Sequence, residues 1–128
     1  MHYALSAADG TGVALDGERR YRLHLPPGTP PTDGFWSISI YEVTQEGGLF
    51  FGDNPIHRYA IGDRTAGLLR NADGSLDILI QRDSPPTNRQ ANWLPVPAKK
   101  FALVARAYRP RAALLDGSFR YPGLEPLN

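Results

Sequence analysis

Ionisable side chains gather in residues 54–65, a stretch that Pro55 and Gly62 interrupt. A regular strand or helix does not run through such a stretch, because proline lacks an N–H donor and glycine favours turns. Guanidinium, imidazole and carboxylate groups in one irregular segment are suited to hold a polar or anionic ligand. The alternative is structural, with Asp63 accepting backbone N–H groups or pairing with an arginine to brace the loop. The candidate binding residues here are His57, Arg58, Asp63 and Arg64.

Two shorter segments, residues 81–85 and 92–95, look like companions of this stretch. They add Asp83, Asn92 and Trp93 to the candidate binding residues. Loops carried on a rigid scaffold commonly hold binding residues. Trp93 has two interpretations, because its ring can plug one end of the fold or form a wall of a ligand groove. The expected partner of these segments is a small polar ligand or a partner domain.

Acid–base catalysis is the alternative use of the same side chains. Asp63 and Asp83 would form the carboxylate pair of a glycoside hydrolase, or His57 would act as a general base near neutral pH. Most of the nine aspartates stand in turn contexts where aspartate is common. No Gly-x-Ser-x-Gly motif supplies a nucleophilic serine, and no spacing supports a pair of Ser84 with His57. The sequence therefore favours a role other than catalysis and assigns no catalytic residue.

Metal ligands are scarce in this chain. The histidines are His2, His24 and His57, and no His-x-Asp or His-x-Glu pair begins a site with two histidines and one carboxylate. His2 lies near a terminus that we expect to be mobile, and His24 lies on the polar face of its strand. The absence of cysteine excludes thiolate zinc sites and disulfides. We predict no metal site and no cofactor.

Charge and hydropathy limit the classes of partner. The net charge of +1 predicts no nucleic-acid partner, although residues 19–22 and 106–111 are locally basic. No run of about 18 apolar residues is present, so we predict no membrane insertion. The first eight residues lack the basic start and long apolar stretch of a signal peptide. A cytoplasmic and a periplasmic location are both compatible with these features, and the sequence does not define the oligomeric state.

The elements that position these segments are expected to be short strands. Apolar and polar residues alternate with the period of a strand in residues 21–25, 35–43, 76–81 and 101–108. Weaker strands are expected at residues 48–51, 59–61 and 68–70. Five Asp-Gly pairs supply turns, the clearest of them within residues 71–75. A helix of about two turns is expected in residues 110–117, opened by proline and ended by glycine.

Several short strands with regularly spaced turns predict an all-β fold, a single antiparallel β-sandwich that is jelly-roll-like. The length fits one domain, residues 1–128. Burial of one large aliphatic side chain contributes about 1.5–3 kcal/mol, so the inward-facing residues dominate the stabilising terms. The expected core consists of Leu23, Leu25, Trp36, Ile38, Ile40, Leu76, Ile78, Ile80, Phe101, Leu103 and Ala105.

A set of short motifs follows in order along nearly the whole chain. They are Leu15-Asp16-Gly17, Tyr21-Arg22-Leu23, residues 30–41 with Phe35-Trp36-Ser37, residues 54–65, residues 71–76, residues 81–85, Asn92-Trp93-Leu94-Pro95 and Leu115-Asp116-Gly117. Together they resemble a bacterial domain-of-unknown-function family, the one numbered twelve-fourteen. The resemblance implies a jelly-roll β-sandwich that usually forms the C-terminal half of proteins carrying domain of unknown function twelve-fifty-four. It implies no established chemistry for any of these residues.

Three functional hypotheses follow. The first is a binding or interaction module for a small polar or carbohydrate-like ligand or a partner domain. The second is a hydrolase acting on a sugar-like substrate, with Asp63 or His57 as acid or base. The third is a structural half of a two-domain protein with no site of its own, which an exposed apolar docking patch would favour.

Overall fold

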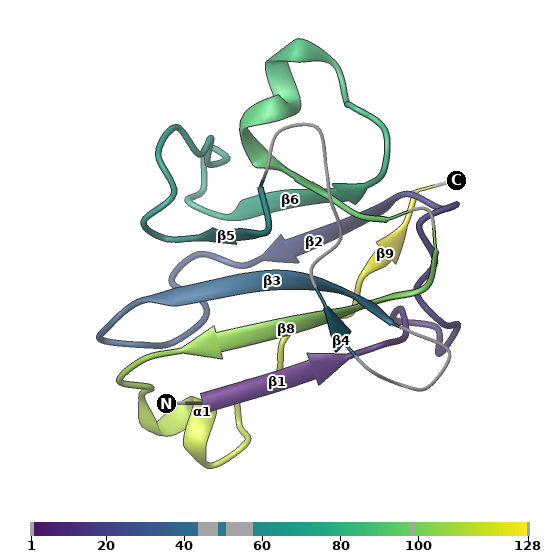
Figure 1. Ribbon diagram of the computed structural model, residues 1–128. Helices are drawn as coiled ribbons and strands as arrows, with labels where there is room; N and C mark the ends of the chain where they lie inside the picture. Colours follow the sequence, from purple (N-terminus) through teal and green to yellow (C-terminus); the bar gives the residue numbers. More distant parts are fainter. Residues whose placement is uncertain (1, 44–48, 51–57, 98, 128) are drawn as a thin grey trace.

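The computed structural model describes residues 2–43, 49–50, 58–97 and 99–127 (Figure 1). His57 and residues 54–56 of the first candidate segment lie outside these ranges. The described elements are β1 (His2–Ser6), β2 (Tyr21–Leu25), β3 (Trp36–Val43), β4 (Leu49–Phe50), β5 (Ala60–Gly62), β6 (Leu76–Gln81), the 3₁₀ helix η1 (Thr87–Asn92), β7 (Trp93–Pro95), β8 (Phe101–Ala107), α1 (Ala112–Leu115) and β9 (Glu125–Pro126).

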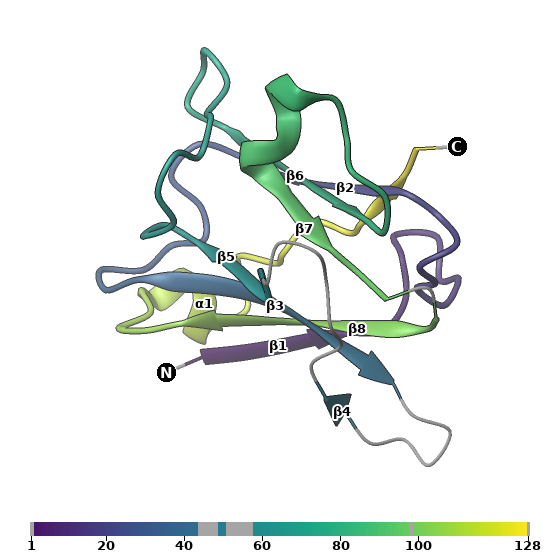
Figure 2. The same ribbon diagram turned by 45° about the horizontal axis from the view of Figure 1, so that its top comes forward.

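The strands form two sheets that face each other, as the sequence predicts (Figures 1 and 2). The first sheet has the order β1-β8-β3-β4, and β5 also pairs with β3. The second sheet has the order β7-β6-β2-β9. All pairs are antiparallel except β6 with β7, which run parallel. The β-sandwich is therefore confirmed, with this one departure from purely antiparallel pairing.

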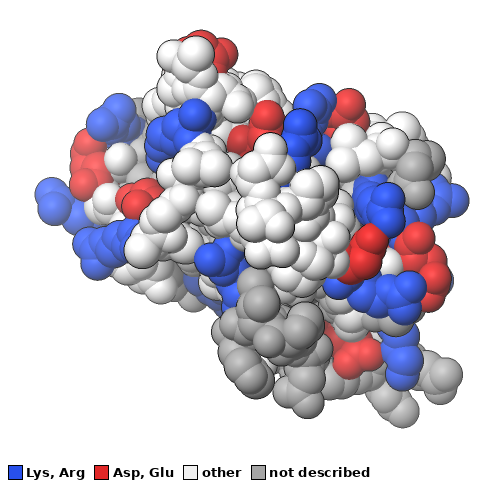
Figure 3. All heavy atoms as spheres, turned by 90° about the horizontal axis from the view of Figure 1, so that it is seen from above, with Lys and Arg blue, Asp and Glu red and all other residues white. Residues whose placement is uncertain are grey.

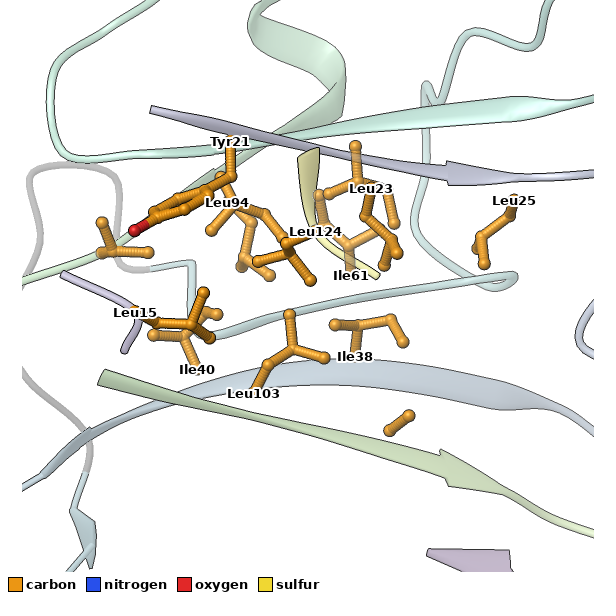
Figure 4. Packing of buried hydrophobic residues seen from close by; sticks show 14 of the residues in the cluster. Leu15, Tyr21, Leu23, Leu25, Ile38, Ile40, Ile61, Leu94, Leu103 and Leu124 are labelled. Carbon is orange, nitrogen blue, oxygen red and sulfur yellow. The ribbon is translucent and has the colours of Figure 1, made fainter. Parts of the chain in front are cut away.

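Alternate residues of both sheets point into the space between them and form the core. Figure 4 shows Leu23 and Leu25 of β2 facing Ile38 of β3 and Leu103 of β8. All eleven expected core residues belong to this cluster. The structure adds six buried residues that the expected core did not include, which are Leu15, Tyr21, Ile61, Leu94, Val96 and Leu124.

The four clear strands are confirmed to within a residue at each end. The strand expected at residues 68–70 is wrong. There the backbone N–H and C=O of Leu69 bond to the side-chain amide of Asn92, so a side chain takes the place of a strand partner. The helix expected in residues 110–117 is shorter, covering only α1.

The expectation of a mobile N-terminus is wrong for His2. It begins β1 and lies opposite Ala107 of β8 in the register of the first sheet. Its strand escaped prediction because its inward positions, His2, Ala4 and Ser6, are small or polar and lack a strand's usual apolar face. In the part of the chain that the structure describes, no helix is long and apolar enough to span a membrane.

Candidate functional site

Three of the predicted site residues, Arg58, Asn92 and Trp93, meet where η1 passes into β7. The Arg58 guanidinium donates from Nη1 to the carbonyl oxygens of Ala91 and Trp93, at 2.9 and 3.1 Å. Trp93 donates from Nε1 to the carbonyl of Gln81 at 2.9 Å, and only 3% of the residue is exposed. Its ring therefore has no free face for stacking on a ligand. Arg58 and Trp93 hold the backbone of this junction in place.

Asn92 joins the same junction to the neighbouring loop and strand. Its Nδ2 donates to the carbonyls of Leu69 and Asp77, at 2.7 and 2.9 Å, and its Oδ1 accepts the Leu69 N–H at 2.9 Å. The amide thus satisfies its two N–H donors and one acceptor position with backbone groups. Asn92 positions the loop of residues 68–71 over the outer face of β6.

Asp63 and Arg64 lie at a different place, beside the start of β3. Asp63 Oδ1 accepts the Trp36 N–H at 3.4 Å. The Arg64 guanidinium lies 4.2 Å from the centre of the Phe35 ring, which is stacked on Tyr108 with ring centroids 4.1 Å apart. A cation over an aromatic face is attracted to it, so Arg64 extends this stack. These contacts support the structural interpretation of both residues.

Asp83 lies at the other end of the sandwich, after β6 and beside the start of β2 (Figure 1). Arg20 donates to both of its carboxylate oxygens, from Nε at 3.2 Å and from Nη2 at 2.5 Å. The hydrogen bond from Arg20 is the main reason that the pKa of Asp83 lies below its usual value. Asp63 and Asp83 therefore have separate partners, and the fold does not bring them together as a catalytic pair.

The outer face of the second sheet carries a cavity of about 280 Å³, here called the polar cavity. It lies between β2 and β6 below, the loop of residues 68–71 on one side and η1 on another. Asn92 belongs to its wall, so one predicted site residue does line a cavity. The other lining residues are Arg22, Leu69, Arg70, Asn71, Asp77, Leu79, Asn88 and Arg89.

The polar cavity contains more positive than negative groups. Arg22 donates to Glu125 at 2.6 Å, and Arg70 donates to the carbonyl of Gly74 at 3.3 Å. Within the described residues, the side chain of Arg89 has no hydrogen-bond or ionic partner. Figure 3 shows that the surrounding upper surface mixes Lys and Arg with Asp and Glu, without an area of one sign. The excess positive charge is therefore a property of the cavity rather than of the whole face.

Among the described residues that line the polar cavity, Asp77 is the acidic group. His24 Nδ1 lies 2.6 Å from Asp77 Oδ1, and Asn71 Nδ2 donates to Oδ2 at 3.1 Å. Burial raises the pKa of Asp77, but the hydrogen bonds from His24 and Asn71 outweigh burial and leave the pKa below its usual value. Asp77 is thus a carboxylate at neutral pH, and its charge is already engaged by its neighbours.

Asp77→Asn is expected to lower the melting temperature near pH 7 and to reduce the loss of stability in acid. A depressed pKa in the folded state adds stability that is fully present above the unfolded-state value of 3.8 and disappears as pH falls through the folded-state value. The pKa values of Asp9, Asp73, Asp83 and Asp116 are lowered too, so the variant should remove only part of the acid effect. Thermal unfolding near pH 7 and near pH 3 measures it. An unchanged difference between the two pH values would contradict this role of Asp77.

Sequence reasoning missed the arginines of the polar cavity. Arg70 and Arg89 stand singly in turn segments, and Arg22 belongs to a basic cluster that reads as a solvated face. The one available signal is that Arg22 lies on the outward face of its strand, opposite the apolar positions. Among the described residues, no group of three or more His, Cys, Asp or Glu side chains is arranged to hold a metal ion.

The chain matches one family model and is similar to solved structures. A family model described as "Protein of unknown function (DUF1214)" matches residues 1–112. The chain is similar to the crystal structure of the VPA0106 protein from Vibrio parahaemolyticus, with 28% identity and a TM-score of 0.85 over 98% of this chain and 30% of that one. A structure from Burkholderia cenocepacia, an uncharacterized protein, shares the fold alone, with 16% identity and a TM-score of 0.52 over 98% of this chain and 34% of that one. The chain thus spans about a third of the length of these structures. Comparison with curated proteins gave no match.

Proposed function

The chain belongs to the DUF1214 family, as its motifs predict. Because the description of that family assigns no function, we propose one from the geometry of the polar cavity. The proposal is a binding module whose polar cavity takes a small anionic ligand, such as a sugar acid. The sequence predicts a small polar or carbohydrate-like ligand, and the arginines of the polar cavity favour one that carries a carboxylate.

The observation that carries the proposal is the arginine set. One cavity is lined by arginines from three separate segments, which are Arg22 of β2, Arg70 of the loop that precedes β6 and Arg89 of η1. The planar guanidinium matches a carboxylate with two parallel hydrogen bonds, and Arg89 has no partner among the described residues. Asn88 adds an amide that can bind hydroxyl groups. This combination suits a ligand with one carboxylate and several hydroxyls.

Binding is favoured over hydrolysis for a geometric reason. A glycosidase needs two carboxyl groups on either side of one bond, about 5–9.5 Å apart. Asp63 follows β5 and Asp83 follows β6, and these strands end at opposite ends of the sandwich (Figure 1). Among the described residues that line the polar cavity, Asp77 is the one carboxylate.

Titration calorimetry with glucuronate, and with glucose as the neutral comparison, tests the proposal. Glucuronate is expected to bind and glucose to bind far more weakly. Arg89→Gln should weaken glucuronate binding about tenfold or more, since a hydrogen bond to a charged group contributes about 1.5–3 kcal/mol. Arg82→Gln is the matched control, because Arg82 is also exposed but lies outside the polar cavity.

Two results would overturn the proposal. One is equal binding of glucuronate and glucose, or no binding of either. The other is an equal effect of Arg89→Gln and Arg82→Gln, which would show that the anion is not held by the polar cavity.

A further inference from the structure

A second and larger cavity, of about 480 Å³, opens on the side of the sandwich where β1 ends the first sheet and β9 ends the second. It is called the lateral cavity here. Its walls include Ala4 of β1, Ala105 of β8 and Leu23 of β2, which are inward-facing positions of both sheets. Ala4 and Ala105 are too small to reach the opposite sheet. The lateral cavity therefore exists because the edge of the first sheet presents small side chains to the core.

The outer wall of the lateral cavity is the segment of residues 117–124, which is held at its two ends. Near one end, the Phe119 N–H donates to the carbonyl of Ala113 at 2.8 Å. At the other, the Gly10 N–H donates to the carbonyl of Leu124 at 3.0 Å, and a Cβ on Gly123 would lie 2.7 Å from Gly10 Cα. No described residue forms a backbone hydrogen bond with residues 120–123. The middle of this wall can shift without breaking backbone hydrogen bonds.

Three buried polar atoms without a hydrogen-bond partner belong to residues of this wall. They are Nδ1 of His2, Oδ2 of Asp9 and the hydroxyl of Tyr121, and no other described residue has such an atom. Buried polar atoms are almost always paired, so their gathering around one cavity calls for an explanation. The rest of the cavity wall is mostly apolar, apart from Ser6 and Arg120.

Of these three groups, Asp9 gives the clearest indication of a bound cation. It is 7% exposed, and its Oδ1 accepts three hydrogen bonds, from Thr11 N at 2.8 Å, Thr11 Oγ1 at 2.6 Å and Val13 N at 3.1 Å. The hydrogen bond from the Thr11 hydroxyl is the main cause that lowers the pKa of Asp9. The carboxylate is thus ionised at neutral pH, with one oxygen saturated and the other without a donor.

Tyr121 lies at the same end of the lateral cavity as Asp9. It stands two residues before Gly123, which touches Gly10, the chain neighbour of Asp9. Burial raises the pKa of Tyr121 to about 12, so its hydroxyl is neutral at neutral pH. His2 lies at the far end, since the strand from His2 to Ser6 alone extends about 13 Å.

We propose that the lateral cavity binds an amphiphilic amine, with the ammonium group at Asp9 Oδ2 and an apolar chain along the inner side of β1. A cation satisfies the unpaired oxygen of a buried carboxylate, and an alkyl chain fits walls of alanine and leucine. Oδ2 is covered in this structure, and the ligand enters where residues 120–122 move aside, between the two held ends of the wall. This site is separate from the polar cavity and does not rest on the proposed function.

The test compares three ligands with one apolar chain and different head groups: octylamine, octanol and octanoate, each below its micelle concentration. Octylamine is expected to bind and to raise the melting temperature, octanol less so, and octanoate not at all. Asp9→Asn should weaken octylamine binding about tenfold, because a hydrogen bond to a charged group contributes about 1.5–3 kcal/mol. The asparagine Oδ1 can still accept the three hydrogen bonds that hold the turn.

A second variant keeps the test decisive if Asp9→Asn does not fold. Ala4→Leu places a large side chain in the lateral cavity without touching Asp9, and it should abolish octylamine binding. Tyr3→Leu is its control, because Tyr3 is the preceding residue of β1, is 58% exposed and does not line the lateral cavity. The proposal is overturned if octanoate binds as well as octylamine, if octylamine does not bind at millimolar concentration, or if Ala4→Leu leaves binding unchanged.

Discussion

Ile78→Asp is expected to abolish cooperative unfolding of this domain. Ile78 is fully buried in the core cluster, and it lies opposite Leu23 in the register of β6 with β2. Loss of a buried isoleucine costs about 2–5 kcal/mol, and an unpaired carboxylate in its place adds several more. This total approaches or exceeds the free energy of unfolding of a typical domain, which is about 5–15 kcal/mol.

Thermal melting by circular dichroism and an amide NMR spectrum would measure this effect. The matched control is Leu115→Asp, which also replaces a large aliphatic side chain by aspartate, at a residue that is 69% exposed at the end of α1. It should leave the melting temperature within a few degrees of the parent protein. A soluble Ile78→Asp protein with a cooperative melt would mean that β6 does not present this residue to the core.

The strands that the sequence predicts are those whose alternation is uninterrupted, such as β2 and β6. In both, every second residue is apolar and fully buried, so the local pattern and the tertiary environment agree. β7 and β9 have three and two residues and contain Pro95 and Pro126. They become strands because β6 and β2 each have an edge with free backbone groups to which they bond. No local sequence pattern carries that information.

The candidate site was harder to predict because its contacts join distant parts of the chain. Asp83 pairs with Arg20, which is 63 residues away, and Asn92 bonds to Leu69, 23 residues away. Grouping residues by their neighbours in sequence placed Asp63 and Asp83 in one site, and the fold separates them. The same reasoning passed over Arg70 and Arg89, since a single arginine in a turn looks like ordinary solvated charge.

Residues 58–65 require a glycine at position 62 for a different reason from the one that the sequence suggests. The sequence suggests that Gly62 allows a sharp turn beside Asp63. A turn does follow, since the Thr65 N–H donates to the Gly62 carbonyl at 3.0 Å, but Gly62 itself is the last residue of β5, pairs with Ser37 of β3 and does not have a positive φ. What requires glycine is space, because a Cβ at this position would lie 2.4 Å from the Trp36 carbonyl oxygen and 3.3 Å from Ser37 Cα.

Gly62→Asn is therefore expected to destabilise the protein strongly, whereas Gly67→Asn is expected to cost much less, namely the strain of a side chain at a positive φ. Asparagine tolerates the left-handed conformation, and Gly67 has a φ of 81° with no atom within 4 Å of an added Cβ. At Gly62 the same side chain must push β5 away from β3 and pull the fully buried Ile61 out of the core. Overpacking costs about 1–3 kcal/mol, and partial loss of Ile61 burial adds to it, so the melting temperature should fall by about 5–15 °C. Thermal melts of the two variants show whether Gly62 is required for space or for a turn. If Gly62→Asn is as stable as Gly67→Asn, the close approach of β5 to β3 is not the reason for a glycine at this position.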